Sequence, residues 1–127
     1  MRILDVGSGR TPKLISDYTE IEIVYCDKKF GDDMENLPYP DKSFDIVICI
    51  NALDHTQNAE KALQEMLRVG QRVYINCAIN ERSTSRKFHW WDAKPDGLFI
   101  NPEGEFDLKK YGFEVDFDDG RMMAWYR

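Results

Sequence analysis

The sequence predicts an α/β fold built on a mainly parallel β-sheet, and three observations lead to this fold class. Short runs that are apolar throughout alternate with helical stretches, as expected for strands buried on both faces of a parallel sheet. The C-terminal part differs, since two runs flank the Asp-Gly pair at residues 119–120 and predict an antiparallel hairpin. The 127 residues contain no repeat and no linker, so we expect a single domain over residues 1–127.

The four strands before the hairpin are short apolar runs, each ending at or followed by a glycine or a polar residue. They cover residues 2–7, 21–26, 44–50 and 72–79. Thr11 and Pro12 predict a helix start, because threonine caps a helix and proline fits its first position. Residues 80–111 carry aromatic residues, prolines and glycines without a clear period, so no element is assigned there.

A second helix is expected to extend from Thr56 or Asn58 to Val69, with Gly70 ending it. Its apolar residues fall on one stripe that would pack on the sheet: Ala59, Ala62, Leu63, Met66 and Leu67.

Composition excludes several classes of protein. The chain is 43% hydrophobic and 31% charged, which is typical of a globular protein rather than a disordered one. Its formal net charge of −6 does not favour a nucleic acid partner, and no apolar run is long enough to span a membrane. Cys26, Cys49 and Cys77 lie in apolar runs and are interpreted as reduced core residues, so we expect a cytoplasmic protein without a metal site.

The stretch "RILDVGSGRTPKLI" predicts a ligand site. Gly7 and Gly9 follow the first strand, where a parallel sheet binds ligands and where side chains would keep a ligand away from the backbone. Asp27 ends the second strand, 20 positions after Gly7, where a carboxylate can bind a ribose diol. A cofactor that contains a nucleoside is therefore favoured. NAD is disfavoured, because Pro12 stands where a dinucleotide fingerprint needs a small residue with an amide hydrogen.

Three segments carry a resemblance to a known family. "ILDVGSG", then "CD" at the end of the second strand, then "DMENLPYPDKSFDIVICINALDH" are similar to the class I S-adenosylmethionine-dependent methyltransferases. The resemblance covers roughly residues 2–80. It implies a Rossmann-like three-layer sandwich with about six strands and a terminal hairpin, and it implies S-adenosyl-L-methionine as cofactor. A pocket rich in carboxylates would suit that cofactor, which carries a sulfonium and an ammonium charge.

The resemblance also implies roles for individual residues. Asp27 would bind the ribose hydroxyls, and Asp33 would accept from the adenine amino group beside Met34. Asn51 and Ala52 would line the cavity next to the sulfonium. The loop beside the methionine part of the cofactor would contain Asp5, Gly7, Ser8 and Gly9.

The chain departs from the family pattern in two places. The family usually has helices before the first strand, and a helix and a strand between the two acids that match Asp27 and Asp33. We therefore expect a minimal form of the fold without the N-terminal cap. An open site, a partner chain or a homodimer would then have to supply what the cap provides.

His55 and His89 are the candidate catalytic residues, each as a general base if the acceptor must lose a proton. Trp90 and Trp91 could stack on a flat acceptor or pack in the core, and residues 80–100 are expected to lie at the rim of the site. The sequence "INAL" after the third strand does not match the tetrad that binds a nucleobase amine.

The predicted function is methyl transfer from S-adenosylmethionine to a small-molecule acceptor. Two alternatives stay open. One is a non-catalytic S-adenosylmethionine-binding module that completes or regulates a partner. The other is an NAD-type oxidoreductase, which Pro12 disfavours.

Overall fold

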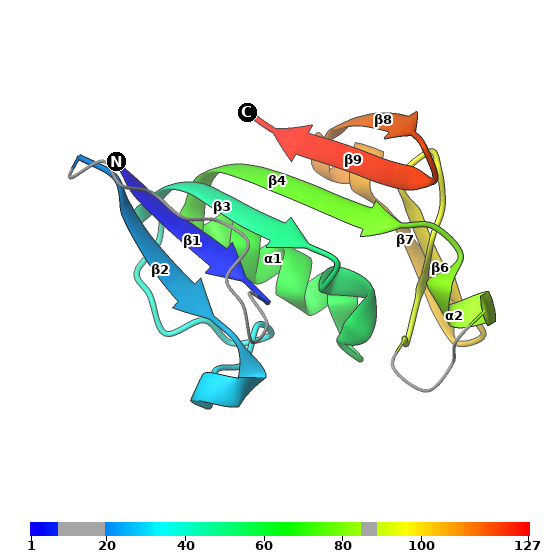
Figure 1. The fold of residues 1–127 in the computed structure, drawn as a ribbon, viewed down its shortest axis with the longest axis horizontal. Helices are drawn as coiled ribbons and strands as arrows, with labels where there is room; N and C mark the ends of the chain where they lie inside the picture. Colours follow the sequence, from blue (N-terminus) through cyan, green and yellow to red (C-terminus); the bar gives the residue numbers. More distant parts are fainter. Residues whose placement is uncertain (8–19, 85–88) are drawn as a thin grey trace.

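The computed structural model of the chain describes residues 1–7, 20–84 and 89–127, and its centre is a six-stranded sheet (Figure 1). The strand order is β2-β1-β3-β4-β9-β8. β1 (Arg2–Val6), β2 (Glu22–Cys26), β3 (Phe44–Ile50) and β4 (Gly70–Ala78) are parallel, while β9 (Arg121–Tyr126) and β8 (Glu114–Asp118) are antiparallel neighbours at one end. The predicted α/β class, the six strands and the reversed hairpin are confirmed.

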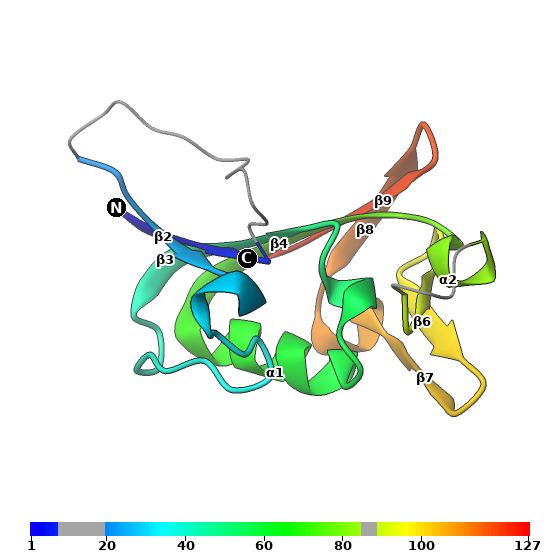
Figure 2. The same ribbon diagram turned by 60° about the horizontal axis from the view of Figure 1, so that its bottom comes forward.

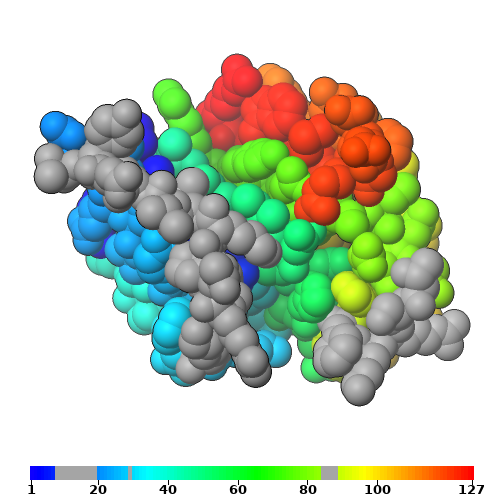
Figure 3. All heavy atoms as spheres, in the orientation of Figure 1, coloured from blue at the N-terminus to red at the C-terminus, as the bar shows by residue number. Residues whose placement is uncertain are grey.

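One face of the central strands is fully buried, while Ile46, Ile48 and Ile50, which alternate with the buried residues of β3, are half-buried. Leu4 and Val6 of β1 pair with Val47 and Cys49 of β3, and all four side chains are fully buried. Cys26, Cys49 and Cys77 are buried free cysteines, as the sequence predicts. In the space-filling view, atoms of β9 and β8 continue the surface formed by β4 (Figure 3).

Helix α1 (Ala59–Val69) lies against one face of the sheet (Figure 2). Asn58 caps it, since its side chain accepts a hydrogen bond from the Lys61 amide at 3.3 Å. The predicted apolar stripe points into the core. Gly70 follows the helix and is the first residue of β4. A Cβ atom at Gly70 would lie 2.5 Å from Val47 Cγ2, so glycine is needed there for close packing. The helix predicted to start at Thr11 and Pro12 lies outside the described residues.

The segment between β2 and β3 contains one short 3-10 turn, η1 (Lys28–Phe30), and no strand. This confirms the expectation drawn from the short spacing of Asp27 and Asp33. Arg68 of α1 fixes the end of the segment, because its guanidinium donates to the carbonyl oxygens of Leu37 (2.9 Å) and Tyr39 (2.7 Å). The short connection between β2 and β3 is therefore held in place by hydrogen bonds to α1.

A second, three-stranded antiparallel sheet occupies the region to which the sequence analysis assigned no element. It consists of β5 (Asp92–Ala93), β6 (Leu98–Asn101) and β7 (Gly104–Asp107), preceded by α2 (Glu81–Thr84) and followed by η3 (Leu108–Tyr111). Figure 2 shows β6 and β7 on the same side of the main sheet as α1. Phe99 stacks on Phe106 at 5.0 Å, and Trp91 meets the edge of Phe106 at 5.2 Å. The two sheets share one hydrophobic core.

The terminal hairpin has the predicted turn. Asp119 and Gly120 both have positive φ angles, 49° and 75°, which is the backbone of a type I′ turn. The flanking residues Asp118 and Arg121 pair across it. In the part of the chain that the structure describes, no helix is long and apolar enough to cross a membrane.

Candidate functional site

Gly7 lies at the carboxyl end of β1, where the chain leaves the sheet. Its amide donates to the carbonyl oxygen of Cys26 at 2.7 Å, and its φ angle is +71°. A Cβ atom at this position would lie 2.2 Å from the Cβ of Ala52. Both the backbone conformation and the close approach therefore require glycine. The assignment of a cofactor loop to this position stays a prediction.

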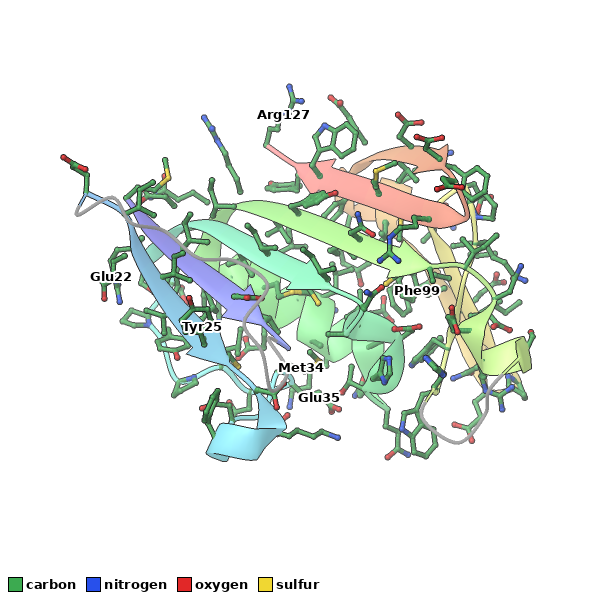
Figure 4. The ribbon with its side chains drawn as sticks, viewed as in Figure 1. Glu22, Tyr25, Met34, Glu35, Phe99 and Arg127 are labelled. Atoms are coloured by element: carbon green, nitrogen blue, oxygen red, sulfur yellow. The ribbon has the colours of Figure 1, made fainter. Side chains whose placement is uncertain are left out.

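Three predicted site residues converge at this point. The methyl carbon of Met34 lies 3.6 Å from the position that a Gly7 Cβ would take, and Ala52 approaches from the end of β3. Figure 4 shows Met34 and Glu35 beside the carboxyl end of β1. Asp5 is buried on β1, with 2% of its surface exposed. Ser8 and Gly9 lie outside the described residues.

Asp27 and Asp33 flank a compact turn after β2. The amide of Asp27 donates to the Asp32 carboxylate at 3.1 Å, and the amide of Asp32 donates back to the Asp27 carbonyl oxygen at 3.2 Å. The Asp33 carboxylate accepts from the Glu35 amide at 2.9 Å, so one of its oxygens shapes the turn. Asp27 is half-buried and Asp33 is exposed. The turn therefore presents both predicted acids from one short segment.

Asn51 is held in place by a residue that the sequence analysis missed. Its φ angle is +54°, and its amide donates to the Asn76 carbonyl oxygen at 2.8 Å. Arg121 of β9 donates through Nη2 to Asn51 Oδ1 and through Nε to Asn76 Oδ1 (2.5 Å). The hairpin thus reaches the end of β3. Nothing in the sequence around Arg121 signals this, because the pairing of β9 with β4 brings it there.

The two candidate bases, His55 and His89, lie side by side. Their ring centroids are 4.3 Å apart, and both face Asp54, which is 2% exposed. His55 Nε2 lies 3.8 Å from Asp54 Oδ1, and His89 Nε2 lies 4.0 Å from Asp54 Oδ2. Burial raises the pKa of Asp54 to about 6, although the nearby His89 lowers it. Asp54 was not among the predicted site residues; its position beside His55 was the available signal.

The backbone of Asp54 anchors the segment that contains His89. The amides of Trp90 and Trp91 donate to the Asp54 carbonyl oxygen at 2.8 and 3.3 Å. The indole of Trp91 donates to the Gln57 carbonyl oxygen at 3.0 Å. As expected, residues 89–91 lie beside the end of β3, packed over the short turn η2 (Leu53–His55). Trp91 is half-buried, whereas Trp90 is 48% exposed.

A pocket of about 600 Å³ adjoins these tryptophans. It combines two indole rings with two carboxylates, those of Glu35 and Glu103, and one guanidinium, that of Arg82. Glu35 is fixed at its edge, because its carboxylate accepts from the Thr56 hydroxyl at 2.7 Å. The rest of the lining comes from Gln57, Asn58, Asn101 and Pro102. Residues 101–103 were not predicted to belong to a site, because only the folding of the second sheet brings them to this pocket.

Comparison with known proteins gives the family. The family model described as "Methyltransferase domain" matches residues 27–72. Ajmaline N-methyltransferase of Rauvolfia serpentina is 31% identical over 97 residues, which are 74% of this chain and 28% of that protein. An uncharacterized protein of Methanocaldococcus jannaschii is 31% identical over 91 residues, 70% of this chain and 39% of that protein. The chain thus spans less than half the length of either relative.

Solved structures show the same fold. A SAM-dependent methyltransferase from Aquifex aeolicus superposes with a TM-score of 0.59 at 16% identity, covering 98% of this chain and 80% of that one. A protein from Pyrococcus horikoshii OT3 gives a TM-score of 0.62 at 18% identity, covering 99% and 82%. The family model, the sequence relatives and the shared fold together support a class I S-adenosylmethionine-dependent methyltransferase, a family whose cofactor is S-adenosyl-L-methionine.

Proposed function

We propose that the chain is an S-adenosylmethionine-dependent methyltransferase that acts on a small-molecule amine. The observation that carries the proposal is the convergence of Gly7, Met34 and Ala52 at the carboxyl ends of β1 and β3. A backbone without a side chain at Gly7, next to an apolar methionine, suits the close approach of a cofactor. The positive φ angle of Gly7 and its closeness to Ala52 require glycine there, so the proposed cofactor site does not depend on the sequence motif alone.

We assign the cofactor contacts residue by residue. The carboxylate of Asp27 would accept from the ribose hydroxyls, and that of Asp33 from the adenine amino group, with Met34 beside the ring. Asp5, Asn51 and Ala52 would surround the methionine part together with Gly7, Ser8 and Gly9. The turn between Asp27 and Asp33 supports this assignment, because it places both acids after the same strand.

An amine acceptor is supported by the pocket. Trp90 and Trp91 contribute aromatic rings, which attract cations, and the two carboxylates of Glu35 and Glu103 outnumber the single guanidinium in the lining. The N-methyltransferase named among the relatives points to the same acceptor chemistry. The pocket would position the amine nitrogen so that it attacks in line with the bond that breaks.

When bound, the cofactor supplies an activated methyl group on a sulfonium. The residues of this chain would orient the acceptor and accept the proton that its nitrogen loses. His55 and His89 are the candidates for that proton, since both rings lie beside the buried Asp54 carboxylate, which stabilises an imidazolium.

Two measurements test the proposal. Calorimetric titration with S-adenosylhomocysteine and with NAD is expected to give binding of the first alone; binding of NAD alone would favour an oxidoreductase. Incubation with S-adenosylmethionine and a panel of primary, secondary and aromatic amines is then expected to release S-adenosylhomocysteine. Binding without turnover on any acceptor class would instead favour the non-catalytic module that completes a partner.

A further inference from the structure

Both histidines of the chain lie against one buried carboxylate. The sequence contains two histidines, His55 in η2 and His89 before β5, and each faces a different oxygen of Asp54. The imidazole nitrogens and a carboxylate oxygen all lie within 4.8 Å of one another. The two histidine side chains of the chain and the Asp54 carboxylate therefore form a group of potential metal ligands.

The distances in this group are too long for hydrogen bonds between these atoms. His55 Nε2 to Asp54 Oδ1 is 3.8 Å and His89 Nε2 to Asp54 Oδ2 is 4.0 Å, whereas an N–H···O bond spans about 2.7–3.2 Å. Among the described residues, none donates a hydrogen bond to Asp54 Oδ1, although the side chain is 3% exposed. Burying such an oxygen costs free energy unless a cation or a donor compensates it.

A metal ion matches this spacing. Zinc binds imidazole nitrogen and carboxylate oxygen at about 2.0–2.2 Å, which puts pairs of ligand atoms about 3–4 Å apart. The two nitrogen–oxygen separations lie at the upper end of that range and all three ligand atoms lie within 4.8 Å of one another, so rotations of the two rings would have to close the site around an ion. Imidazole with carboxylate is also a ligand set that suits divalent transition metals rather than calcium or magnesium.

The surroundings of the group favour a cation and hold the ligands in place. The carboxylates of Glu81 and Asp92 add negative potential at Asp54. The Asp54 carbonyl oxygen accepts from the amides of Trp90 and Trp91, which fixes the segment next to His89. The side chain of His55 is 42% exposed, so an ion has a path from solvent.

We propose that Asp54, His55 and His89 form a binding site for a divalent transition-metal ion such as Zn²⁺. Three protein ligands leave at least one coordination position for water or for an oxygen or nitrogen of the acceptor. A metal-bound imidazole is not a general base, so the ion would then promote loss of the acceptor proton in place of the histidines. That catalytic role rests on the proposed methyl transfer, whereas metal binding itself does not.

The test measures metal binding directly. Chain treated with EDTA and then freed of it is titrated with ZnCl₂ against a chromophoric chelator, and with CoCl₂ while the visible absorption of bound cobalt is recorded. One equivalent of Zn²⁺ is expected, with loss of affinity of about tenfold or more in His55→Ala and in His89→Ala. Glu114→Gln, which changes an exposed carboxylate on β8, is the matched control and is expected to bind as the unaltered chain does.

Circular dichroism in the absence of metal checks that the histidine variants fold. If the double variant His55→Ala/His89→Ala binds Zn²⁺ as tightly as the unaltered chain, or if the unaltered chain takes up none, the inference is wrong. Calorimetry with S-adenosylhomocysteine on the same samples separates the two proposals. A chain that binds S-adenosylhomocysteine and no metal overturns the metal site alone, and the opposite pattern overturns the proposed function alone.

Discussion

The amide of Trp90 donates to the carbonyl oxygen of Asp54, which ties the start of the second sheet to the turn after β3. Together with the hydrogen bonds that Trp91 donates to the carbonyl oxygens of Asp54 and Gln57, this contact holds the tryptophans at the edge where the parallel strands end. The edge is formed by segments that come from three separate parts of the sequence, those around Gly7, Asp54 and Trp90.

The first prediction concerns hydrogen exchange in this segment. Because residues 89–91 lie over η2 at the edge of the proposed site, binding of S-adenosylhomocysteine should slow exchange of the Trp90 and Trp91 amides. Exchange in peptides covering residues 80–84 and 89–100 is compared by mass spectrometry with and without ligand, using the hairpin β8–β9 as the internal reference. Equal exchange in both states would mean that the tryptophans serve the core and not ligand binding.

The second prediction concerns Gly7. Gly7→Ala places a Cβ atom 2.2 Å from that of Ala52 at a φ angle of +71°, and the left-handed conformation alone costs about 1–2 kcal/mol. We expect lower stability in urea and at least tenfold weaker binding of S-adenosylhomocysteine. Gly104→Ala is the matched control, since no atom lies within 4 Å of its added Cβ.

A second substitution separates the two causes at Gly7. The double variant Gly7→Ala/Ala52→Gly removes the colliding carbon while keeping the backbone conformation, so it should recover part of the loss. No recovery at all would show that crowding with Ala52 is not the reason for glycine.

Much of this architecture is predictable from the sequence, for reasons that particular residues make clear. Asp119 and Gly120 specify their turn locally, and the apolar runs of β1 and β3 identify them as central strands of the sheet. Asp27 and Asp33 lie in one short segment, so their closeness in space can be predicted from their closeness in the sequence. Arg121 meets Asn51 only through the β4–β9 pairing, which no local pattern specifies.

The second sheet escaped prediction for a related reason. β5 has two residues, and β6 and β7 have four each, which is too short for an alternating pattern to stand out. Their stability comes from tertiary contacts such as the stacking of Phe99 on Phe106. The pocket residues Asn101 and Glu103 were missed with them.

The third prediction concerns Asp27. Asp27→Ala removes the carboxylate assigned to the ribose hydroxyls and is expected to weaken S-adenosylmethionine binding by about 1–3 kcal/mol. Isothermal titration calorimetry measures the difference, and Glu114→Ala controls for the loss of one negative charge elsewhere on the surface. Unchanged affinity in Asp27→Ala would rule out the ribose assignment.

The last prediction concerns pH and the pair Glu65–Arg68. Arg68 donates to Glu65 at 2.6 Å, and this hydrogen bond lowers the pKa of Glu65 from its ordinary value of 4.5. The same carboxylate accepts from the Leu37 amide at 2.9 Å, so the pair joins α1 to the segment before β3.

A lowered carboxyl pKa in the folded state gives stability that is fully present above 4.5 and is lost as the pH falls through the lowered value. Glu65→Gln should therefore reduce the free energy of unfolding at pH 7 by about 1 kcal/mol, which is below the usual value for a hydrogen bond to a charged group because the Arg68 side chain is 33% exposed. The difference from the unaltered chain should shrink steadily below pH 4.5 in urea melts. Glu114→Gln is the control with no expected pH-dependent difference, and a Glu65→Gln deficit that stays constant down to low pH would contradict an ionic origin.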